Sequence, residues 1–135
     1  MRKKLGIVMD PIQSINYEKD TSLLILLAAK KAGFEIRSQQ ETALNELDVI
    51  LMRKDPPFDK EYIYSTYILE AASKLGVLVV NDPKSLRDCN EKIFATEFSD
   101  CTPPLLVSKN IPLLKKFLHL HQNVVYKPLD GMGGE

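Results

Sequence analysis

The sequence predicts an α/β fold built on a parallel sheet, and three observations carry this prediction. Short apolar runs of strand length alternate with longer segments whose apolar residues recur at helical spacing. The two longest helical segments each follow an aspartate and end at a glycine, the usual start and stop signals of helices. With 44% hydrophobic and 27% charged residues, the composition is that of a globular protein with a core.

The first part of the chain contains the clearest alternation. Its opening apolar run is bounded by lysines and by Asp10, and because it is apolar on both faces we expect a central parallel strand. Asp20 or Thr21 caps a helix that ends at Gly33, and Asp59 caps a longer amphipathic helix. The expected strands are residues 4–9, 34–37, 48–52 and 77–80.

The pattern restarts in the second part. Short helical pieces are expected at residues 85–89 and 90–100, followed by a proline pair. The elements expected after it are a strand at 105–107, a helix at 111–121 and a strand at 124–127. We therefore expect two domains, residues 1–88 and 89–135.

Composition excludes several classes of function. The 18 basic and 18 acidic residues balance, which argues against nucleic acid and anionic membranes as partners. The apolar run 23–29 is far shorter than the roughly 20 residues of a membrane span. Without an export signal, Cys89 and Cys101 are expected to be buried free thiols of a cytoplasmic protein. His119 and His121 diverge on their helix, and no carboxylate cluster suits Mg²⁺, so no metal ligand and no catalytic residue is assigned.

The segment 124–135 is the most informative stretch. A β-branched run leads to Lys127 and then to three glycines, Gly131, Gly133 and Gly134. The segment matches neither a Walker motif nor a dinucleotide fingerprint. Its backbone N–H groups can still approach phosphate oxygens closely, with Lys127 as a point charge beside them. On spacing alone, a simple turn is the better interpretation.

Charged residues at strand ends form a second candidate site. Arg53, Lys54 and Asp55 follow one expected strand and Asp10 follows another, at the carboxyl ends where open α/β sheets bind ligands. Arginine can clamp a carboxylate and aspartate can bind an ammonium group, but charged turns are also common here. Lys92, in an Asn-Glu-Lys sequence, is by position alone a solvated helix lysine.

Five blocks of sequence carry a family resemblance. They are M-D-P-I (9–12), D-V-I-L-M-R-K-D-P-P-F-D (48–59), Y-I-L-E (67–70), S-L-R-D-C-N-E-K (85–92) and K-P-L-D-G-M-G-G (127–134). In this order they resemble the bacterial glutathione synthetases. The resemblance implies a Rossmann-like, pre-ATP-grasp N-terminal domain followed by an incomplete ATP-grasp domain.

The resemblance also implies an activity. Such an enzyme uses ATP and Mg²⁺ to join γ-glutamylcysteine and glycine through an acyl phosphate. Lys92 and Lys127 match the two lysines of the family that contact ATP, and Gly131, Gly133 and Gly134 begin its phosphate-covering loop. Asp10, Arg53, Lys54 and Asp55 fall on the substrate side, by a weaker match.

Two departures from the family pattern qualify these expectations. The family has a longer segment between the strand near Phe34 and the strand at Asp48, and it continues beyond the glycine-rich loop into residues that supply its Mg²⁺ ligands. We therefore expect the 135 residues to be part of a longer enzyme and inactive alone. The alternatives are a non-catalytic α/β module that binds a ligand or a subunit, and another ATP-grasp ligase; a homo-oligomer is left open.

Overall fold

The structure is a computed structural model that describes residues 3–18, 20–34, 36, 41–55 and 57–131. It divides into two compact units, Met1–Arg87 (unit 1) and Asp88–Glu135 (unit 2). The elements of unit 1, in chain order, are β1 (Leu5–Val8), α1 (Thr21–Lys31), the 3₁₀ helix η1 (Leu44–Glu46), β2 (Val49–Met52), α2 (Lys60–Lys74), β3 (Leu78–Val80) and most of α3 (Pro83–Asp88). Unit 2 contains the 3₁₀ helix η2 (Phe94–Cys101) and α4 (Ile111–His121).

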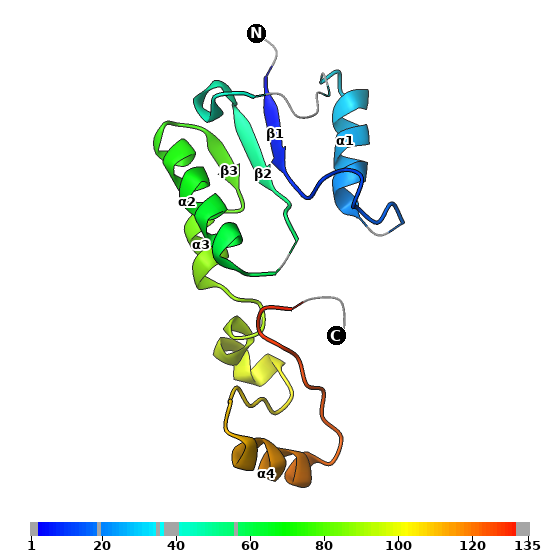
Figure 1. Ribbon diagram of the computed structural model, residues 1–135, viewed down its shortest axis with the longest axis vertical. Helices are drawn as coiled ribbons and strands as arrows, with labels where there is room; N and C mark the ends of the chain where they lie inside the picture. Colours follow the sequence, from blue (N-terminus) through cyan, green and yellow to red (C-terminus); the bar gives the residue numbers. More distant parts are fainter. Residues whose placement is uncertain (1–2, 19, 35, 37–40, 56, 132–135) are drawn as a thin grey trace. The chain divides into compact units, whose positions relative to one another are not determined.

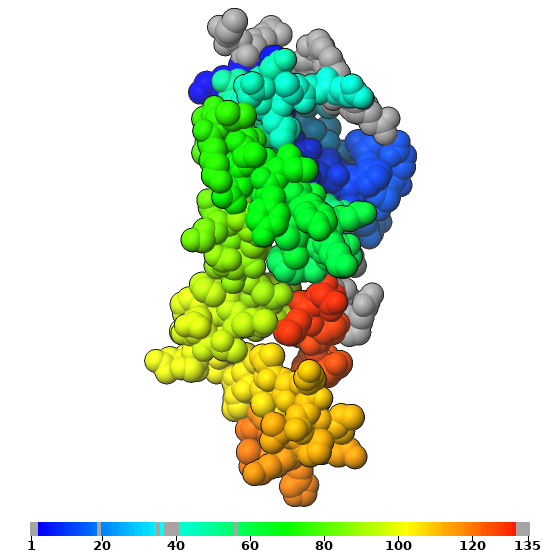
Figure 2. All heavy atoms as spheres, turned by 60° about the vertical axis from the view of Figure 1, so that its left-hand side comes forward, coloured from blue at the N-terminus to red at the C-terminus, as the bar shows by residue number. Residues whose placement is uncertain are grey.

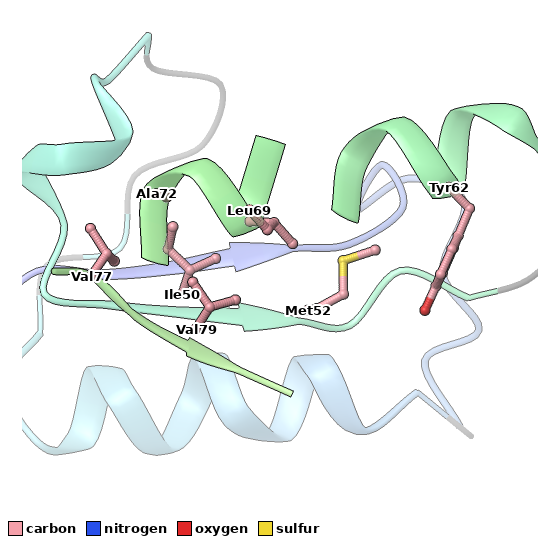
Figure 3. Close-up of a cluster of buried hydrophobic side chains, with 7 residues drawn as sticks. All are labelled: Ile50, Met52, Tyr62, Leu69, Ala72, Val77 and Val79. Carbon is pink, nitrogen blue, oxygen red and sulfur yellow. The ribbon is translucent and has the colours of Figure 1, made fainter. Parts of the chain in front are cut away.

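The described residues of unit 1 contain a three-stranded parallel sheet in the order β1-β2-β3. Leu5 pairs with Val49 at one end of β1 and Val8 with Met52 at the other, so the carboxyl ends of the two strands meet. In Figures 1 and 3, α1 and α2 lie on opposite sides of the three strands. The predicted α/β class with a parallel sheet is confirmed.

Local signals place both long helices of unit 1. The Asp20 carboxylate accepts a hydrogen bond from the Ser22 N–H at 2.6 Å, and the Asp59 carboxylate accepts one from the Tyr62 N–H at 2.9 Å. Each helix is followed within two residues by a glycine with positive φ, +87° at Gly33 and +94° at Gly76. The sequence therefore predicted these helix ends to within a residue or two.

The core of unit 1 lies between the sheet and α2. Ile50 is only 1% exposed at the centre of β2 and packs with Leu69 of α2 and Val79 of β3 (Figure 3). The whole cluster consists of Ile50, Met52, Tyr62, Leu69, Ala72, Val77 and Val79. Because the buried residues of β2 alternate along the strand, one face of β2 points into this cluster.

Arg87 joins α3 to α2. Its guanidinium forms an ion pair with Glu70, donates a hydrogen bond to the Thr66 hydroxyl at 3.1 Å and lies 4.4 Å from the centre of the Tyr67 ring. Thr66 is fully buried, and Lys74 forms a second ion pair with Glu70 at 2.9 Å. The two cations hold the pKa of Glu70 below its ordinary value, Lys74 contributing most.

Gly6 allows the segment before β2 to approach β1 closely. A Cβ atom at this position would lie 2.8 Å from Cδ1 of Leu47, closer than side chains tolerate. An alanine at this position would therefore force the Leu47 side chain to shift.

The position of β1 differs from the prediction. We expected a central strand, but in the described residues β1 pairs only with β2 and lies at the sheet edge. Of the strand expected at residues 34–37, Phe34 and Ile36 are not in a strand, and the other two residues lie outside the described ones. An apolar run shows that a strand is buried, not how many neighbours it has.

Unit 2 differs more. Residues 105–107 and 124–127 were expected to be strands and are irregular, because a strand needs a partner and neither segment has one among the residues described. The helix expected at 90–100 is instead the 3₁₀ helix η2, with a non-helical backbone at Phe98. Cys89 and Cys101 are exposed, so the expectation of buried thiols was wrong.

Candidate functional site

Predicted site residues and the residues that contact them form two groups with defined geometry, one in each unit. The first, the unit 1 rim, consists of Asp10, Thr21, Arg53, Lys54 and Asp55. The second, the Lys92 cluster, consists of Asn90, Lys92, Leu129 and Gly131.

The parallel register explains the unit 1 rim. Asp10 follows β1 and Arg53 follows β2, and the Arg53 N–H donates to the carbonyl of Val8 at 2.7 Å. This hydrogen bond continues the ladder one residue beyond β2 and brings the two strand ends together. The carboxyl ends of β1 and β2 therefore present these charged residues side by side.

Asp10 is the acceptor at the centre of the rim. Its carboxylate lies 3.1 Å from Nζ of Lys54 and accepts a longer hydrogen bond, 3.4 Å, from the Asp55 N–H. The hydrogen bond to Asp10 raises the pKa of Lys54 more than burial lowers it, so the ammonium is charged at neutral pH. A substrate ammonium would have to share Asp10 with Lys54.

Arg53 points to a different partner. It is exposed, and its guanidinium donates to the hydroxyl of Thr21 at the first turn of α1. A guanidinium has five N–H donors, so this contact leaves it able to bind a carboxylate as well. The sequence did not predict that Thr21 contacts Arg53. The only local signal at Thr21 was its position at the start of the expected helix.

In unit 2 the Lys92 ammonium contacts the glycine-rich segment. Nζ lies 2.5 Å from the carbonyl oxygen of Gly131, 39 residues later, and 3.2 Å from the carboxylate of Glu91. The Lys92 side chain is 19% exposed, so it is not the solvated lysine that position alone suggested. An ammonium has three donors, and these two acceptors do not exhaust it.

Asn90 organises the same region from both sides. Its side-chain oxygen accepts hydrogen bonds from the N–H groups of Lys92 at 3.0 Å and Ile93 at 3.2 Å. Its side-chain nitrogen donates to the carbonyl of Leu129 at 3.1 Å. Asn90 was not predicted as a site residue, although an asparagine two residues before Lys92 is a turn signal that could have identified it.

Three predicted ATP-site residues remain. Lys127 is exposed, and Gly133 and Gly134 lie outside the described residues. Within the described part of the chain, no three His, Cys, Asp or Glu residues gather into a group that could hold a metal ion. The described residues by themselves therefore do not supply the ligands of a Mg²⁺ site. Nor does any helix of that part have the length and apolar character to cross a membrane.

Comparison with known families covers nearly the whole chain. The family described as prokaryotic glutathione synthetase, N-terminal domain, matches residues 3–38 and 33–87, and the ATP-grasp domain of the same enzyme matches residues 91–135. The two N-terminal matches overlap at residues 33–38, so the match to this domain is interrupted there.

Curated relatives agree with the family match. The chain is 49% identical over 168 residues to a glutathione synthetase of Pseudomonas aeruginosa, covering 99% of this chain and 53% of the relative. It is 47% identical over 165 residues to those of Citrobacter rodentium and Escherichia coli O157:H7, covering 97% of this chain and 52% of each relative. The chain therefore spans about half the length of the curated relatives it matches. An alignment of 168 residues against a chain of 135 also means that the relatives contain internal residues that this chain lacks.

Proposed function

Because the chain belongs to the prokaryotic glutathione synthetase family, we propose that it forms part of an ATP-dependent ligase that joins γ-glutamylcysteine to glycine. In this reaction the terminal carboxylate of γ-glutamylcysteine takes the γ-phosphoryl group of ATP. The glycine amine then displaces phosphate from the acyl phosphate, which gives glutathione, ADP and phosphate. Membership of this family argues against a non-catalytic module.

The observation that best supports an ATP-binding role is the contact between Lys92 and Gly131. The resemblance makes Lys92 an ATP-contacting lysine and Gly131 the start of the phosphate-covering loop, and these two residues meet in unit 2 although they lie 39 residues apart. We propose that the Lys92 ammonium neutralises phosphate charge and that its contact with the Gly131 carbonyl orients the glycine-rich segment. Lys127, Gly133 and Gly134 complete this proposed ATP site.

The unit 1 rim is proposed to bind the dipeptide substrate. Arg53 can hold a carboxylate in bidentate geometry, while Asp10 and Lys54 offer one charge of each sign. Asp55 adds a second carboxylate at the same strand end. Mg²⁺, when bound, would offset the negative charge of the phosphates. The use of ATP and Mg²⁺ and a cytoplasmic location are proposed together with the ligase reaction.

Substrate dependence tests the proposed reaction. The protein as its source cells produce it should release phosphate from ATP only when γ-glutamylcysteine and glycine are both present, with one glutathione formed for each phosphate. Equal phosphate release without γ-glutamylcysteine would refute the proposal.

Substitution tests the proposed ATP site in the same protein. Lys92→Met removes a charged contact to phosphate, so the KM for ATP should rise about tenfold or more. Lys109→Met is the matched control, because Lys109 is an exposed lysine of the same unit and should leave the KM unchanged. If both variants behave alike, Lys92 has no role in binding ATP.

A further inference from the structure

Asn90 connects two segments of unit 2 that the family resemblance assigns to the ATP site. One segment leads to Lys92 and the other leads to the glycine-rich loop that begins at Gly131. In Figure 2 the red residues near the end of the described chain lie against the yellow-green residues around position 90. The half-buried Asn90 side chain spans this contact, with an acceptor facing one segment and a donor facing the other.

The partners of the Asn90 amide fix its orientation. Its oxygen faces the N–H groups of Lys92 and Ile93, which can only donate. Its nitrogen faces the carbonyl of Leu129, which can only accept. A flipped amide would place donors against donors and an acceptor against an acceptor. Aspartate lacks the donor and alanine lacks both groups, so the contact needs a side chain that carries one of each.

Hydrogen bonds connect the two segments at two successive points. The Asn90 side chain donates to the Leu129 carbonyl at 3.1 Å, and the ammonium of Lys92 donates to the Gly131 carbonyl at 2.5 Å. The backbone N–H of Lys92 is itself bonded to the Asn90 oxygen at 3.0 Å, so the same amide fixes the point from which the lysine side chain extends. The contact between Lys92 and Gly131 therefore depends on Asn90 at both of its ends.

Neither partner of this contact is rigid by itself. A lysine ammonium sits at the end of a flexible four-carbon stem, and glycine has more backbone freedom than any other residue. The hydrogen bond at the Lys92 N–H and the one two residues before Gly131 restrict both partners before a ligand arrives. Such preorganisation lowers the entropic cost of binding.

We propose that Asn90 is a positioning residue of the ATP site. Its side-chain amide holds the backbone of Lys92 and the segment that ends at Gly131 in register, so that the ammonium and the glycine-rich loop meet the phosphates of ATP together. Asn90 acts through Lys92 and not by a contact of its own with ATP. This inference rests on the ATP-binding function proposed for Lys92.

A double-mutant cycle with Lys92→Met tests the proposal in the protein as its source cells make it. Asn90→Ala should raise the KM for ATP about fivefold, as expected for the loss of one hydrogen bond, and should leave the KM for γ-glutamylcysteine unchanged. In the Lys92→Met background the same substitution should raise the KM for ATP by less than about twofold, because the ammonium that Asn90 positions is already absent. A general effect on folding would instead raise it equally in both backgrounds.

Two further variants sharpen the test. Asn90→Ser keeps an oxygen that can accept from the Lys92 N–H, but its shorter side chain does not reach Leu129, so the KM for ATP should also rise. Asn123→Ala is the matched control, because Asn123 is an exposed asparagine of the same unit and should leave the KM unchanged.

The outcomes separate this inference from the function on which it rests. If Lys92→Met raises the KM for ATP but Asn90→Ala or Asn90→Ser does not, the positioning role is overturned and the ATP site stands. Equal increases for Asn90→Ala in both backgrounds overturn the role as well. If Lys92→Met alone leaves the KM unchanged, the proposed ATP site fails, and this inference fails with it.

NMR relaxation without ATP adds a readout that does not depend on activity. Loss of the hydrogen bond to Leu129 should lower the backbone order parameter of Gly131 in Asn90→Ala, because the glycine-rich segment gains freedom on the fast timescale that this parameter reports. The order parameter should keep its ordinary value in Asn123→Ala. A value for Gly131 that Asn90→Ala does not change contradicts the positioning role.

Discussion

Shortening Ile50 to alanine should remove much of the stability of unit 1. The substitution deletes three carbon atoms from a side chain that is 1% exposed, a loss of about 2.4 kcal/mol at about 0.8 kcal/mol per buried methylene. The cavity left between Leu69 and Val79 adds to this loss, which brings the expected total to about 3–4 kcal/mol. Domains are stable by only about 0.05–0.15 kcal/mol per residue, so unit 1 would lose a large share of its free energy of unfolding.

Native-state hydrogen exchange of the β2 amides measures this loss within unit 1 alone. Two controls bracket it. Ile50→Val keeps most of the side chain and should cost about 0.5–1.5 kcal/mol. Tyr64→Ala lies on the exposed side of α2, where the tyrosine is 63% exposed, and should change the free energy by no more than about 0.5 kcal/mol. If Ile50→Ala costs no more than Tyr64→Ala, the cluster between β2 and α2 is not the core of unit 1.

Three further predictions concern other contacts. Gly6→Ala should lower the melting temperature in a thermal scan, because the new Cβ would lie 2.8 Å from Leu47; an unchanged midpoint would mean that Leu47 moves aside freely. Glu70→Gln should destabilise the protein most near neutral pH and less as pH falls. The folded-state pKa of Glu70 lies below 4.5, and the stabilising effect of its carboxylate is lost as pH falls through that lowered pKa. Urea titrations at several pH values check this, and a difference in stability that does not change with pH would contradict it. Asn90→Asp keeps the acceptor for the Lys92 N–H but loses the donor to the Leu129 carbonyl. Amide chemical shifts in NMR spectra should therefore change more near Leu129 than near Lys92. The reverse pattern would count against this role of Asn90.

The sequence predicted those parts of the fold that local chemistry decides. The start and end of both long helices of unit 1 could be predicted, because the aspartate before each helix and the glycine after it act within one turn of the helix. The buried strand β2 could be found because a short apolar run bounded by charge has few other interpretations. In these cases neighbouring residues were sufficient.

What the sequence could not provide depends on distant partners. The place of β1 at the edge depends on whether another strand pairs with it, and the strands expected at 105–107 and 124–127 depend on partners that the described residues do not offer. The contacts within the candidate sites also depend on residues that are distant in the sequence. The hydrogen bonds from Arg53 to Thr21 and from Lys92 to Gly131 join residues 32 and 39 positions apart, which no local spacing specifies. The roles proposed for these residues, and the domain boundary after residue 88, stay predictions.

Among the described residues β1 has a strand partner on one side only, and its other edge bears on how the protein behaves at high concentration. An unpaired strand edge is a template on which other chains can assemble through backbone hydrogen bonds, and this is a common start of aggregation. Lysine is a residue that natural edge strands use against such assembly, and Lys3 and Lys4 precede β1 at its exposed start. Lys4 is already paired with Glu46 at 3.1 Å, so its charge is partly offset. The colloidal stability of the protein should therefore depend on salt, because screening of the lysine charges weakens the repulsion between neighbouring edges.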